Sequence, residues 1–295
     1  MAMTKPEAAK LSNDLLLRGV IETIVKESPV LSYLPFMSVT GTAVTYNREA
    51  TMPAATFYGV GDTWTEATPT FSQKVASLKI LGGDADVDNF LQQTYADTND
   101  IEAEVIASRA KAVAHKFTET FYTGDIVVDV DGFDGLQTIV PSAQTVSMGT
   151  NGAALTFDKL DEMIDKIKPG KPEVLLMSKR TRRKLKSLRR ADGISTETRL
   201  NEFGQQVETY DGIPILVDDF CPDNETQGSG TALSSIWALK FGVGAGIMGL
   251  EHGGITVERV GELETKDATR HRIKWYCGLA LFSELGVARL SAITA

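Results

Sequence analysis

The sequence predicts an α+β fold, and three regions support this prediction. Residues 39–80 contain two runs rich in Val, Thr and aromatic residues, which is typical of two long antiparallel strands. Residues 98–123 repeat apolar side chains at helical spacing, which predicts one long helix. Residues 131–254 alternate amphipathic helices with short apolar strands, which favours helices packed on a small sheet.

Composition narrows the class of protein. The chain has 295 residues and a formal net charge of −9, so non-specific binding to DNA or to anionic lipid is disfavoured. A chain of this length can bury a substantial core without crosslinks. The two cysteines, Cys221 and Cys277, are too few for a disulfide framework, which favours a reducing compartment. No apolar run is long enough to cross a bilayer, and we expect no membrane partner.

The first elements are predicted to be a helix and an extended arm. Apolar residues from Leu11 to Val25 recur three and four apart and indicate a helix that ends before Pro29. The following segment PVLSYLPFMSV, residues 29–39, is apolar and interrupted by prolines. We expect an arm that crosses a neighbouring surface, because a lone arm would leave these apolar groups exposed.

The two strands of residues 39–80 are expected to form a ribbon with a wide tip. Between them lies PAATFYGVGDTWTEATP, which holds Phe57, Tyr58 and Trp64. A two-stranded ribbon is only marginally stable alone in water. We therefore expect the ribbon and its aromatic tip to lie on another surface.

Residues 84–96 are expected to form a short helix that begins with DADVD. Asp84, Asp86 and Asp88 resemble the start of a calcium loop. Asn89 and Tyr95, however, stand where such a loop needs glycine and glutamate. Acidic residues in the first turn of a helix also interact favourably with its dipole. We favour this second interpretation and predict no metal site.

No motif in the sequence predicts an enzyme. Residues 244–249, GAGIMG, match a dinucleotide-binding pattern, but a strand is expected next, where that pattern needs a helix. A turn between two strands is therefore favoured. The three histidines, His115, His252 and His271, lie at no metal-ligand spacing. We predict no catalytic residue and no cofactor.

A basic helix is predicted at residues 178–190, where eight of the 30 Lys and Arg residues lie without an acid between them. Ser178 can cap its start, and Leu185 and Leu188 share one face. The side chains expected to point away from that face are Arg182, Lys186, Arg189 and Arg190. Three interpretations stay open: contact with DNA, contact with an acidic partner such as a second copy, and a solvated face.

The order of these parts resembles the major capsid protein of tailed bacteriophages, the Hong Kong ninety-seven fold. SPVLSYLPFMSV is similar to the end of its N-terminal arm, residues 39–80 to its extended loop and residues 98–123 to its spine helix. A short Phe-x-Gly-Leu phrase after the spine is matched by Phe133, Asp134, Gly135 and Leu136. Residues 155–188 resemble the helix, strand and helix of its axial domain, and residues 273–293 resemble the closing strands of its peripheral domain.

The resemblance implies five regions and a function. The regions are an N-terminal arm at 1–38, an extended loop at 39–80, a peripheral domain with the spine helix at 81–130, an axial domain at 131–254 and the closing strands of the peripheral domain at 255–295. Copies of such a protein form hexamers and pentamers that close into an icosahedral head around double-stranded DNA. We expect the protein in the virion, after assembly in the host cytoplasm.

Two other functions stay open. An encapsulin-type nanocompartment shell has the same fold and encloses enzymes instead of a genome. A DNA-binding protein that uses the basic helix 178–190 would bind DNA tightly and in a salt-sensitive manner. The ribbon and the arm favour a shell, because both need neighbours to cover them.

The resemblance also implies partners and contact residues. We expect contact with further copies of this chain, a separate scaffolding protein, a portal protein and enclosed DNA without sequence-specific contact; a decoration protein is left open. Some family members join subunits through a lysine of the extended loop, and residues 41–71 contain no lysine, so no such crosslink is expected. Residues 261–270 carry mixed charge that suits contacts between several subunits. The candidate interface residues are Phe57, Tyr58, Trp64, Arg182, Lys186, Arg189, Glu262, Glu264, Lys266 and Arg270.

Overall fold

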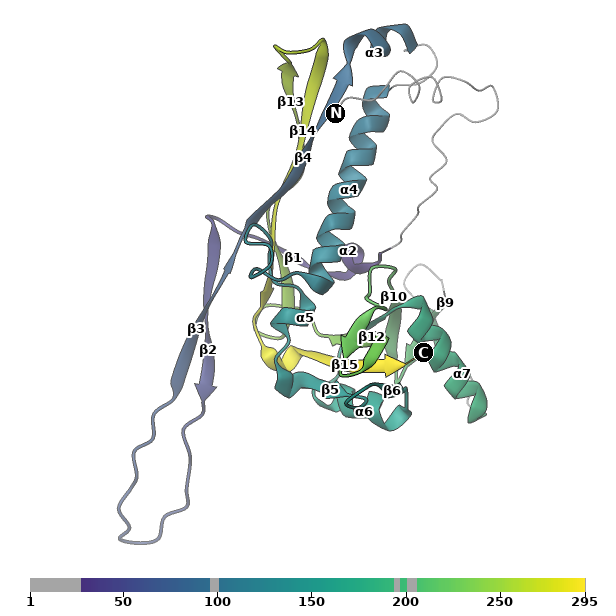
Figure 1. Ribbon diagram of the computed structural model, residues 1–295. Helices are drawn as coiled ribbons and strands as arrows, with labels where there is room; N and C mark the ends of the chain where they lie inside the picture. Colours follow the sequence, from purple (N-terminus) through teal and green to yellow (C-terminus); the bar gives the residue numbers. More distant parts are fainter. Residues whose placement is uncertain (1–27, 96–100, 194–196, 201–205, 295) are drawn as a thin grey trace.

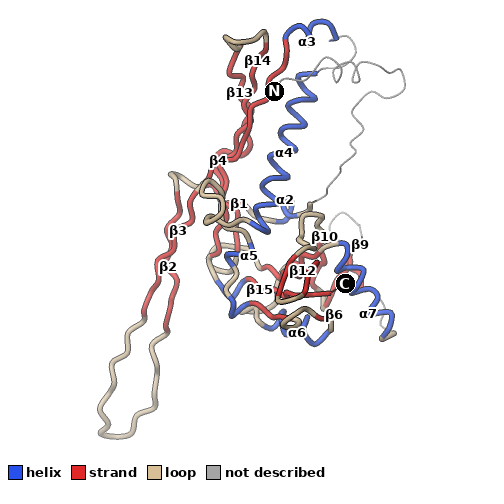
Figure 2. Tube along the Cα trace, in the orientation of Figure 1, coloured by secondary structure: helices blue, strands red, loops and turns tan. Residues whose placement is uncertain are grey.

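The computed structural model describes residues 28–95, 101–193, 197–200 and 206–294 (Figure 1). The helix expected from Leu11 to Val25 lies outside the described residues. The described part contains two sheets, a separate two-stranded ribbon and one long helix (Figure 2). The ribbon projects away from the body of the molecule, and the long helix and the sheet beside it extend in the other direction (Figure 1).

The helices of the described chain lie mostly between residues 89 and 191, and runs of strands precede and follow them. The helices are α2 (Val30–Tyr33), α3 (Asn89–Tyr95), α4 (Ile101–Thr123), α5 (Leu136–Ile139), α6 (Phe157–Asp165) and α7 (Lys179–Ala191), with short 3₁₀ turns η1 (Ser142–Gln144) and η2 (Glu284–Gly286). The strands are β1 (Phe36–Ser38), β2 (Ala43–Thr51), β3 (Thr70–Ser77), β4 (Lys79–Asp88), β5 (Thr145–Ser147), β6 (Ala153–Ala154), β7 (Val174–Met177), β8 (Glu197–Leu200), β9 (Gln206–Tyr210), β10 (Ile213–Val217), β11 (Glu225–Gln227), β12 (Gly230–Leu239), β13 (Ile247–Glu262), β14 (Ala268–Leu281) and β15 (Val287–Thr294).

A four-stranded sheet in the order β1-β13-β14-β4 runs beside α4 (Figure 1). Strands β13 and β14 form a long antiparallel hairpin, and β4 pairs antiparallel with β14 from Lys79 to Asp88. Helix α4 packs its apolar side chains on this sheet, and the Phe117 ring lies 4.7 Å from the Trp275 ring of β14. The long helix predicted at residues 98–123 is confirmed.

A nine-stranded sheet forms the second part of the fold, in the order β5-β15-β12-β7-β10-β9-β8 with β6 and β11 attached. The four residues of β7 are all buried. Leu175 and Met177 pack with α6 and α7, whereas Val174 and Leu176 belong to the cluster that contains Phe117 of α4. Because β7 is covered on both faces, it is a continuous apolar run instead of an alternating one.

The segment 29–39 packs on its own chain, which corrects the expectation of an arm across a neighbour. Val30, Leu34 and Val39 are 3%, 4% and 4% exposed. Strand β1 pairs in parallel with β13 from Phe36 to Ser38. Most apolar side chains of this segment thus complete the core of the same chain, whereas Tyr33 is 41% exposed.

Residues 84–88 belong to strand β4, which corrects the helix expected at residues 84–96. Helix α3 begins only at Asn89. Alternate side chains of a strand share one face, so Asp84 and Asp86 point to the same side. They lie opposite Arg272 and Arg270 of β14 in the pairing register. The acidic run therefore serves cross-strand pairing and not the dipole of a helix.

The last strand leaves the long sheet, which corrects part of the expected division into regions. Strand β15 pairs with β12 of the nine-stranded sheet, although all of residues 255–295 were expected to close the peripheral domain. The boundary expected after residue 254 also falls inside β13. Strand β15 is buried at six of its eight positions, and such an apolar strand is stable only where both faces are covered.

Helix α4 ends in a close backbone crossing with residues 133–136. The Gly135 N–H donates a hydrogen bond to the Gly124 carbonyl at 2.9 Å. A Cβ atom on Gly135 would lie 2.3 Å from the Thr120 carbonyl oxygen, so only glycine fits. Phe133 and Leu136 are buried on either side of this glycine. The Phe-x-Gly-Leu phrase thus packs the segment after α4 closely against the end of that helix.

Candidate assembly surfaces

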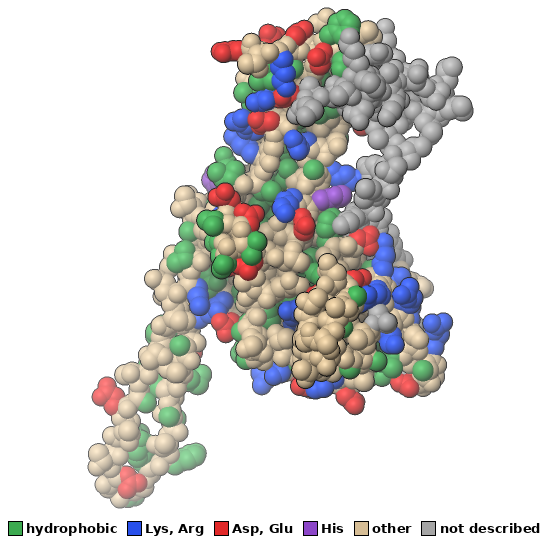
Figure 3. Space-filling view, in the orientation of Figure 1, with side chains coloured by type: hydrophobic (Ala, Val, Ile, Leu, Met, Phe, Trp, Pro, Cys, Tyr) green, Lys and Arg blue, Asp and Glu red, His purple; other side chains and the backbone are tan. Residues whose placement is uncertain are grey.

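The ribbon tip, residues 52–69 between β2 and β3, carries uncovered apolar side chains (Figure 3). Phe57 and Trp64 are 107% and 79% exposed. The Tyr58 ring stacks on the Trp64 ring with centroids 4.4 Å apart, and its hydroxyl accepts a hydrogen bond from the Thr65 N–H at 2.9 Å. The ribbon predicted at residues 39–80 is confirmed, and its tip presents an ordered aromatic pair to solvent. A contact role for the tip stays a prediction.

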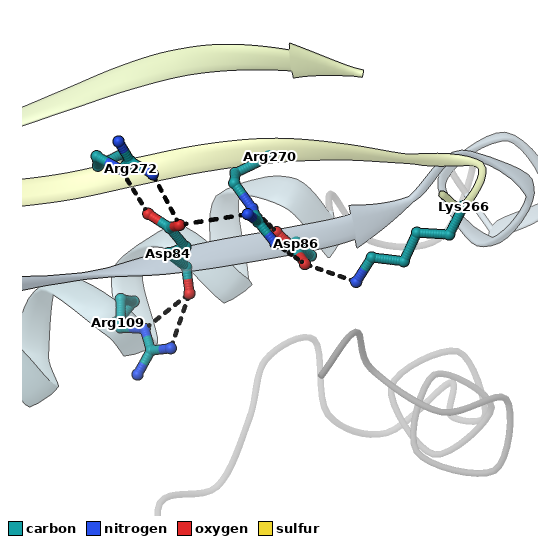
Figure 4. Close-up of polar contacts among 6 residues, drawn as sticks. All are labelled: Asp84, Asp86, Arg109, Lys266, Arg270 and Arg272. Carbon is teal, nitrogen blue, oxygen red and sulfur yellow. Dashed lines mark hydrogen bonds and ion pairs between the residues drawn. The ribbon is translucent and has the colours of Figure 1, made fainter. Parts of the chain in front are cut away.

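Five charged side chains form what we call the charge ladder, between the far ends of β4 and β14 (Figure 4). They are Asp84, Asp86, Lys266, Arg270 and Arg272. Arg270 donates two hydrogen bonds to Asp86 at 2.6 and 2.8 Å, and Arg272 donates two to Asp84 at 2.8 and 3.0 Å. Lys266 adds a contact of 2.6 Å to Asp86. The ladder therefore contains two bidentate ion pairs, and in each pair an aspartate of β4 faces an arginine of β14.

The charge ladder lowers the pKa of one of its carboxyl groups, and it includes two residues that were expected at subunit contacts. Hydrogen bonds from Arg270 hold the pKa of the Asp86 carboxyl well below its ordinary value. Lys266 and Arg270 were candidate interface residues, and the structure binds both to an acid of the same chain. Glu262 and Glu264, the acidic candidates nearby, are exposed. An interface role for these four residues stays a prediction.

Replacing Asp86 by Asn should lower the free energy of unfolding by about 1–2 kcal/mol at pH 7, because both cations lose a charged acceptor but are themselves partly solvated. An acid whose pKa is lowered by folding contributes stability above its unfolded pKa and loses it as the pH falls. The difference between Asp86→Asn and the unchanged chain should therefore shrink below about pH 4. Urea unfolding across pH checks this, with the exposed Glu262→Gln as control; a difference that stays constant to pH 3 contradicts it.

Helix α4 also contacts this end of the sheet. The Arg109 guanidinium donates two hydrogen bonds, at 3.2 and 2.7 Å, to the backbone carbonyl of Asp84 (Figure 4). Strand β4 is the last strand of the four-stranded sheet. Arg109 therefore occupies a backbone acceptor on an open sheet edge.

The basic helix is confirmed as α7, and Lys and Arg side chains gather over it (Figure 3). Ser178 caps it by accepting a hydrogen bond from the Thr181 N–H at 3.2 Å. Part of its charge is balanced within the chain: Lys179 contacts Asp219 at 2.8 Å, and Lys186 forms an ion pair with Glu208. Asp219 lies in the acidic segment VDDFCPDNE, residues 217–225, so this segment supplies an acid to a cation of its own chain.

Two candidate arginines of α7 differ in their placement. Arg189 is 4% exposed, which corrects the expectation that it points outward. Its guanidinium donates a hydrogen bond to the Thr209 carbonyl at 2.8 Å and lies 5.4 Å from the centre of the Tyr210 ring. Burial of its long side chain adds to the packing of α7 on β9. Arg182 is partly exposed, and its interface role stays a prediction.

Sequence analysis missed a buried acid that joins three parts of the chain. The Asp218 carboxylate is 0% exposed and accepts hydrogen bonds from the Ser28 hydroxyl at 2.6 Å and the Tyr122 hydroxyl at 2.9 Å. Burial raises the pKa of Asp218. The acid connects the start of the arm, the end of α4 and the end of β10. An acid directly after an apolar strand was the only signal for it in the sequence.

Sequence analysis also missed an aliphatic turn beside the base of the ribbon. Val127, Val128 and Val130 are 85%, 85% and 71% exposed. Local hydrogen bonds order the turn, because the Val128 N–H donates to the Asp125 carbonyl at 3.1 Å and Lys79 donates to the Val130 carbonyl at 2.7 Å. Three exposed valines in an ordered turn are a second apolar surface of this chain.

Within the ranges that the structure describes, no three His, Cys, Asp or Glu side chains are grouped so that they could hold a metal ion. No helix of those ranges is long and apolar enough to cross a membrane. Both cysteines are buried as free thiols, and burial raises the pKa of Cys277 to about 12. The turn expected at residues 244–249 is confirmed, since β13 begins at Ile247 without an intervening helix.

Comparisons with known proteins agree with this fold. The chain shares the fold of the SrpI encapsulin from Synechococcus elongatus PCC 7942, with a TM-score of 0.75, 19% identity, and coverage of 99% of this chain and 96% of that one. The capsid of a native GTA particle gives a TM-score of 0.67 at 16% identity, covering 97% and 99% of the two chains. A structure from Mycobacterium phage Bobi gives 0.67 at 13% identity and covers 100% of both.

These likenesses establish only the fold, because each sequence identity is below 20%. No curated protein sequence matches the chain. The family assignment comes from the sequence itself, because residues 11–291 match the phage capsid family. This match spans the ribbon, the long helix and both sheets. The chain therefore belongs to the phage capsid family and is a major capsid protein, a structural component of the virion.

Proposed function

We propose that copies of this chain form hexamers and pentamers that close into an icosahedral head around double-stranded DNA. The observation that carries this proposal is the ribbon. It projects from the body with an ordered aromatic tip that the described part of the same chain leaves uncovered. Symmetric contact between many copies covers such surfaces without a catalytic group, and we propose that the protein has no enzymatic activity.

Negative-stain electron microscopy of the purified protein, at several concentrations and salt levels, tests this proposal. Closed shells or rings of five and six subunits are expected. Compact particles near the monomer mass of 31.9 kDa under every condition, also with the neighbouring genes co-expressed, would overturn it. We further propose a separate scaffolding protein and a portal protein as partners, which the same co-expression can reveal.

A nanocompartment shell is the nearest alternative, because an encapsulin shares the fold. The family match favours a phage capsid. Nuclease-protected double-stranded DNA inside purified particles separates the two functions, since a nanocompartment encloses protein. Shells that hold an enzyme and no nucleic acid would favour the nanocompartment.

Direct DNA binding through α7 is less favoured by the structure. Lys and Arg bind DNA by neutralising its phosphates, and an ion pair within the protein competes with that contact. Lys179 and Lys186 have acids of the same chain as partners, and Arg189 is buried. We propose that the enclosed DNA is held without sequence-specific contact.

Subunits are expected to remain non-covalent. Residues 41–71 contain no lysine, and the Lys79 ammonium donates to the Val130 carbonyl at the base of the ribbon. Purified shells boiled in detergent should run as a single band at the monomer mass on a denaturing gel. A ladder of multimers would show that another residue forms a crosslink.

A further inference from the structure

One face of the ribbon attaches it to the core. Strands β2 and β3 pair only with each other among the described residues, and β3 continues through Leu78 into β4 of the long sheet. Beyond this connection, side chains help to set the direction in which the ribbon leaves the core. Val44 and Tyr46 of β2 pack in the cluster around Val39. The opposite face is open, with Phe71 and Val75 of β3 66% and 63% exposed. The attachment therefore depends on one face of the ribbon, to which β2 contributes Val44 and Tyr46 and β3 contributes the buried Ala76.

Arg48 supplies the polar part of this attachment. Its Nε donates a hydrogen bond to the Phe282 carbonyl at 3.1 Å, and its other nitrogens donate to the Leu281 carbonyl and the Glu284 carboxylate. The Tyr46 hydroxyl donates to the Leu281 carbonyl at 2.7 Å, and its ring lies 4.8 Å from the Phe282 ring. We name these five residues the Arg48 clamp.

The clamp suits a guanidinium group. Three acceptors surround one planar donor, whereas the single ammonium of a lysine cannot serve all three in that arrangement. The Arg48 side chain is 16% exposed and Glu284 is 48% exposed, so the arginine is enclosed and the carboxylate lies at the rim. Hydrogen bonds from a charged donor are stronger than neutral ones. The clamp thus joins the ribbon to the core through charge-assisted hydrogen bonds from one enclosed arginine.

We propose that Arg48 is a positioning residue for shell assembly: it sets the direction of the ribbon so that the tip reaches a neighbouring copy. This proposal rests on the proposed function, because it assumes that the tip is a subunit contact. Strand β2 pairs Arg48 with Ser72. From that pair to Gly61, the extended chain spans roughly 40 Å. A small rotation at the clamp therefore displaces the tip by a large distance.

The first measurement concerns unassembled protein. Spin labels on Thr63→Cys at the tip and Asp158→Cys on α6 report the distance from the ribbon to the body, while both native cysteines are buried. The unchanged clamp should give one narrow distribution of distances. Arg48→Ala removes all three hydrogen bonds of the guanidinium and should raise the population of displaced ribbons at least about tenfold, the factor expected for one charge-assisted hydrogen bond alone. Arg48→Lys and Glu284→Gln should each give a population of displaced ribbons between those of the unchanged chain and Arg48→Ala.

The matched control is Lys74→Ala, which removes an exposed cation from the same ribbon and leaves the clamp intact. The second measurement is the yield of closed shells, which should fall with Arg48→Ala and not with Lys74→Ala. Thermal unfolding checks that each variant is folded. If Arg48→Ala does not fold, Glu284→Gln takes its place in both measurements.

The outcomes separate the clamp from the proposed function. A distance distribution that Arg48→Ala leaves narrow overturns the proposal. A broadened distribution with an unchanged yield of shells also overturns it, while the proposed function stands. If the unchanged chain forms no shells, the proposed function and the assembly role of Arg48 fail together, and the distances then report only a structural clamp.

Discussion

Replacing both Phe57 and Trp64 by serine is expected to abolish closed shells while leaving the unassembled subunit as stable as the unchanged chain. In the subunit these side chains are 107% and 79% exposed, so their removal loses only the exposed stacking of Trp64 on Tyr58 and no core packing. In a shell, burial of each aromatic ring contributes about 1.5–3 kcal/mol. Under the proposed assembly every copy would repeat the contact, so a loss of this size at one interface would act many times in one shell.

Sedimentation and electron microscopy at matched protein concentrations measure the loss of shells, and thermal unfolding measures subunit stability. Val243→Ser is the matched control, because Val243 is an exposed aliphatic residue outside the ribbon, 64% exposed. The double serine variant should remain as subunits or small rings where the control still closes. Normal shells from the double variant at the usual concentration would show that the tip is not a subunit contact.

Gly135→Ala is expected to destabilise the subunit itself, by about 3 kcal/mol or more. The added methyl group would lie 2.3 Å from the Thr120 carbonyl oxygen and 2.6 Å from the Gly124 nitrogen, and both are backbone atoms that cannot rotate away. The end of α4 and the segment after it would have to separate. Their hydrogen bond, from the Gly135 N–H to the Gly124 carbonyl, would then be lost.

Urea unfolding of the unassembled protein measures this effect, and the melting temperature should fall by about 2–4 °C for each kcal/mol lost. Gly132→Ala is the control in the same segment, because the nearest atom to its new methyl group is 3.3 Å away. Equal stability of the two variants would mean that the crossing relaxes without cost.

Elements with a strong local pattern could be predicted from the sequence. Helix α4 repeats apolar residues at helical spacing over its full length, and β7 is an apolar run short enough to be a strand. The ribbon followed from Val, Thr and aromatic residues on both sides of a tip rich in glycine and proline. In these cases one local pattern is enough to predict the element, because a single apolar face or apolar run identifies it.

Contacts between distant segments were harder to predict, although two patterns in the sequence indicated some of them. Aspartates at 84, 86 and 88 recur every second residue, which is the period of a strand, and basic residues at 270, 272 and 274 do the same. Thr181, Leu185 and Arg189 are four apart and share one helical face, but the charge of Arg189 concealed its burial. The Arg48 clamp has no such pattern, because its acceptors are backbone carbonyls more than 230 residues away in the chain.

The position of Arg109 has a consequence for the protein before it assembles. An open sheet edge can add a strand from any other copy, which is the first step of aggregation. Arg109 occupies a carbonyl acceptor of β4, and the aspartates of that strand place charge beside it. A capsid protein accumulates in many copies before its shell closes, and its copies must meet through the intended surfaces. By occupying one acceptor of this edge strand, Arg109 should make strand addition less favourable there and so favour solubility during that interval.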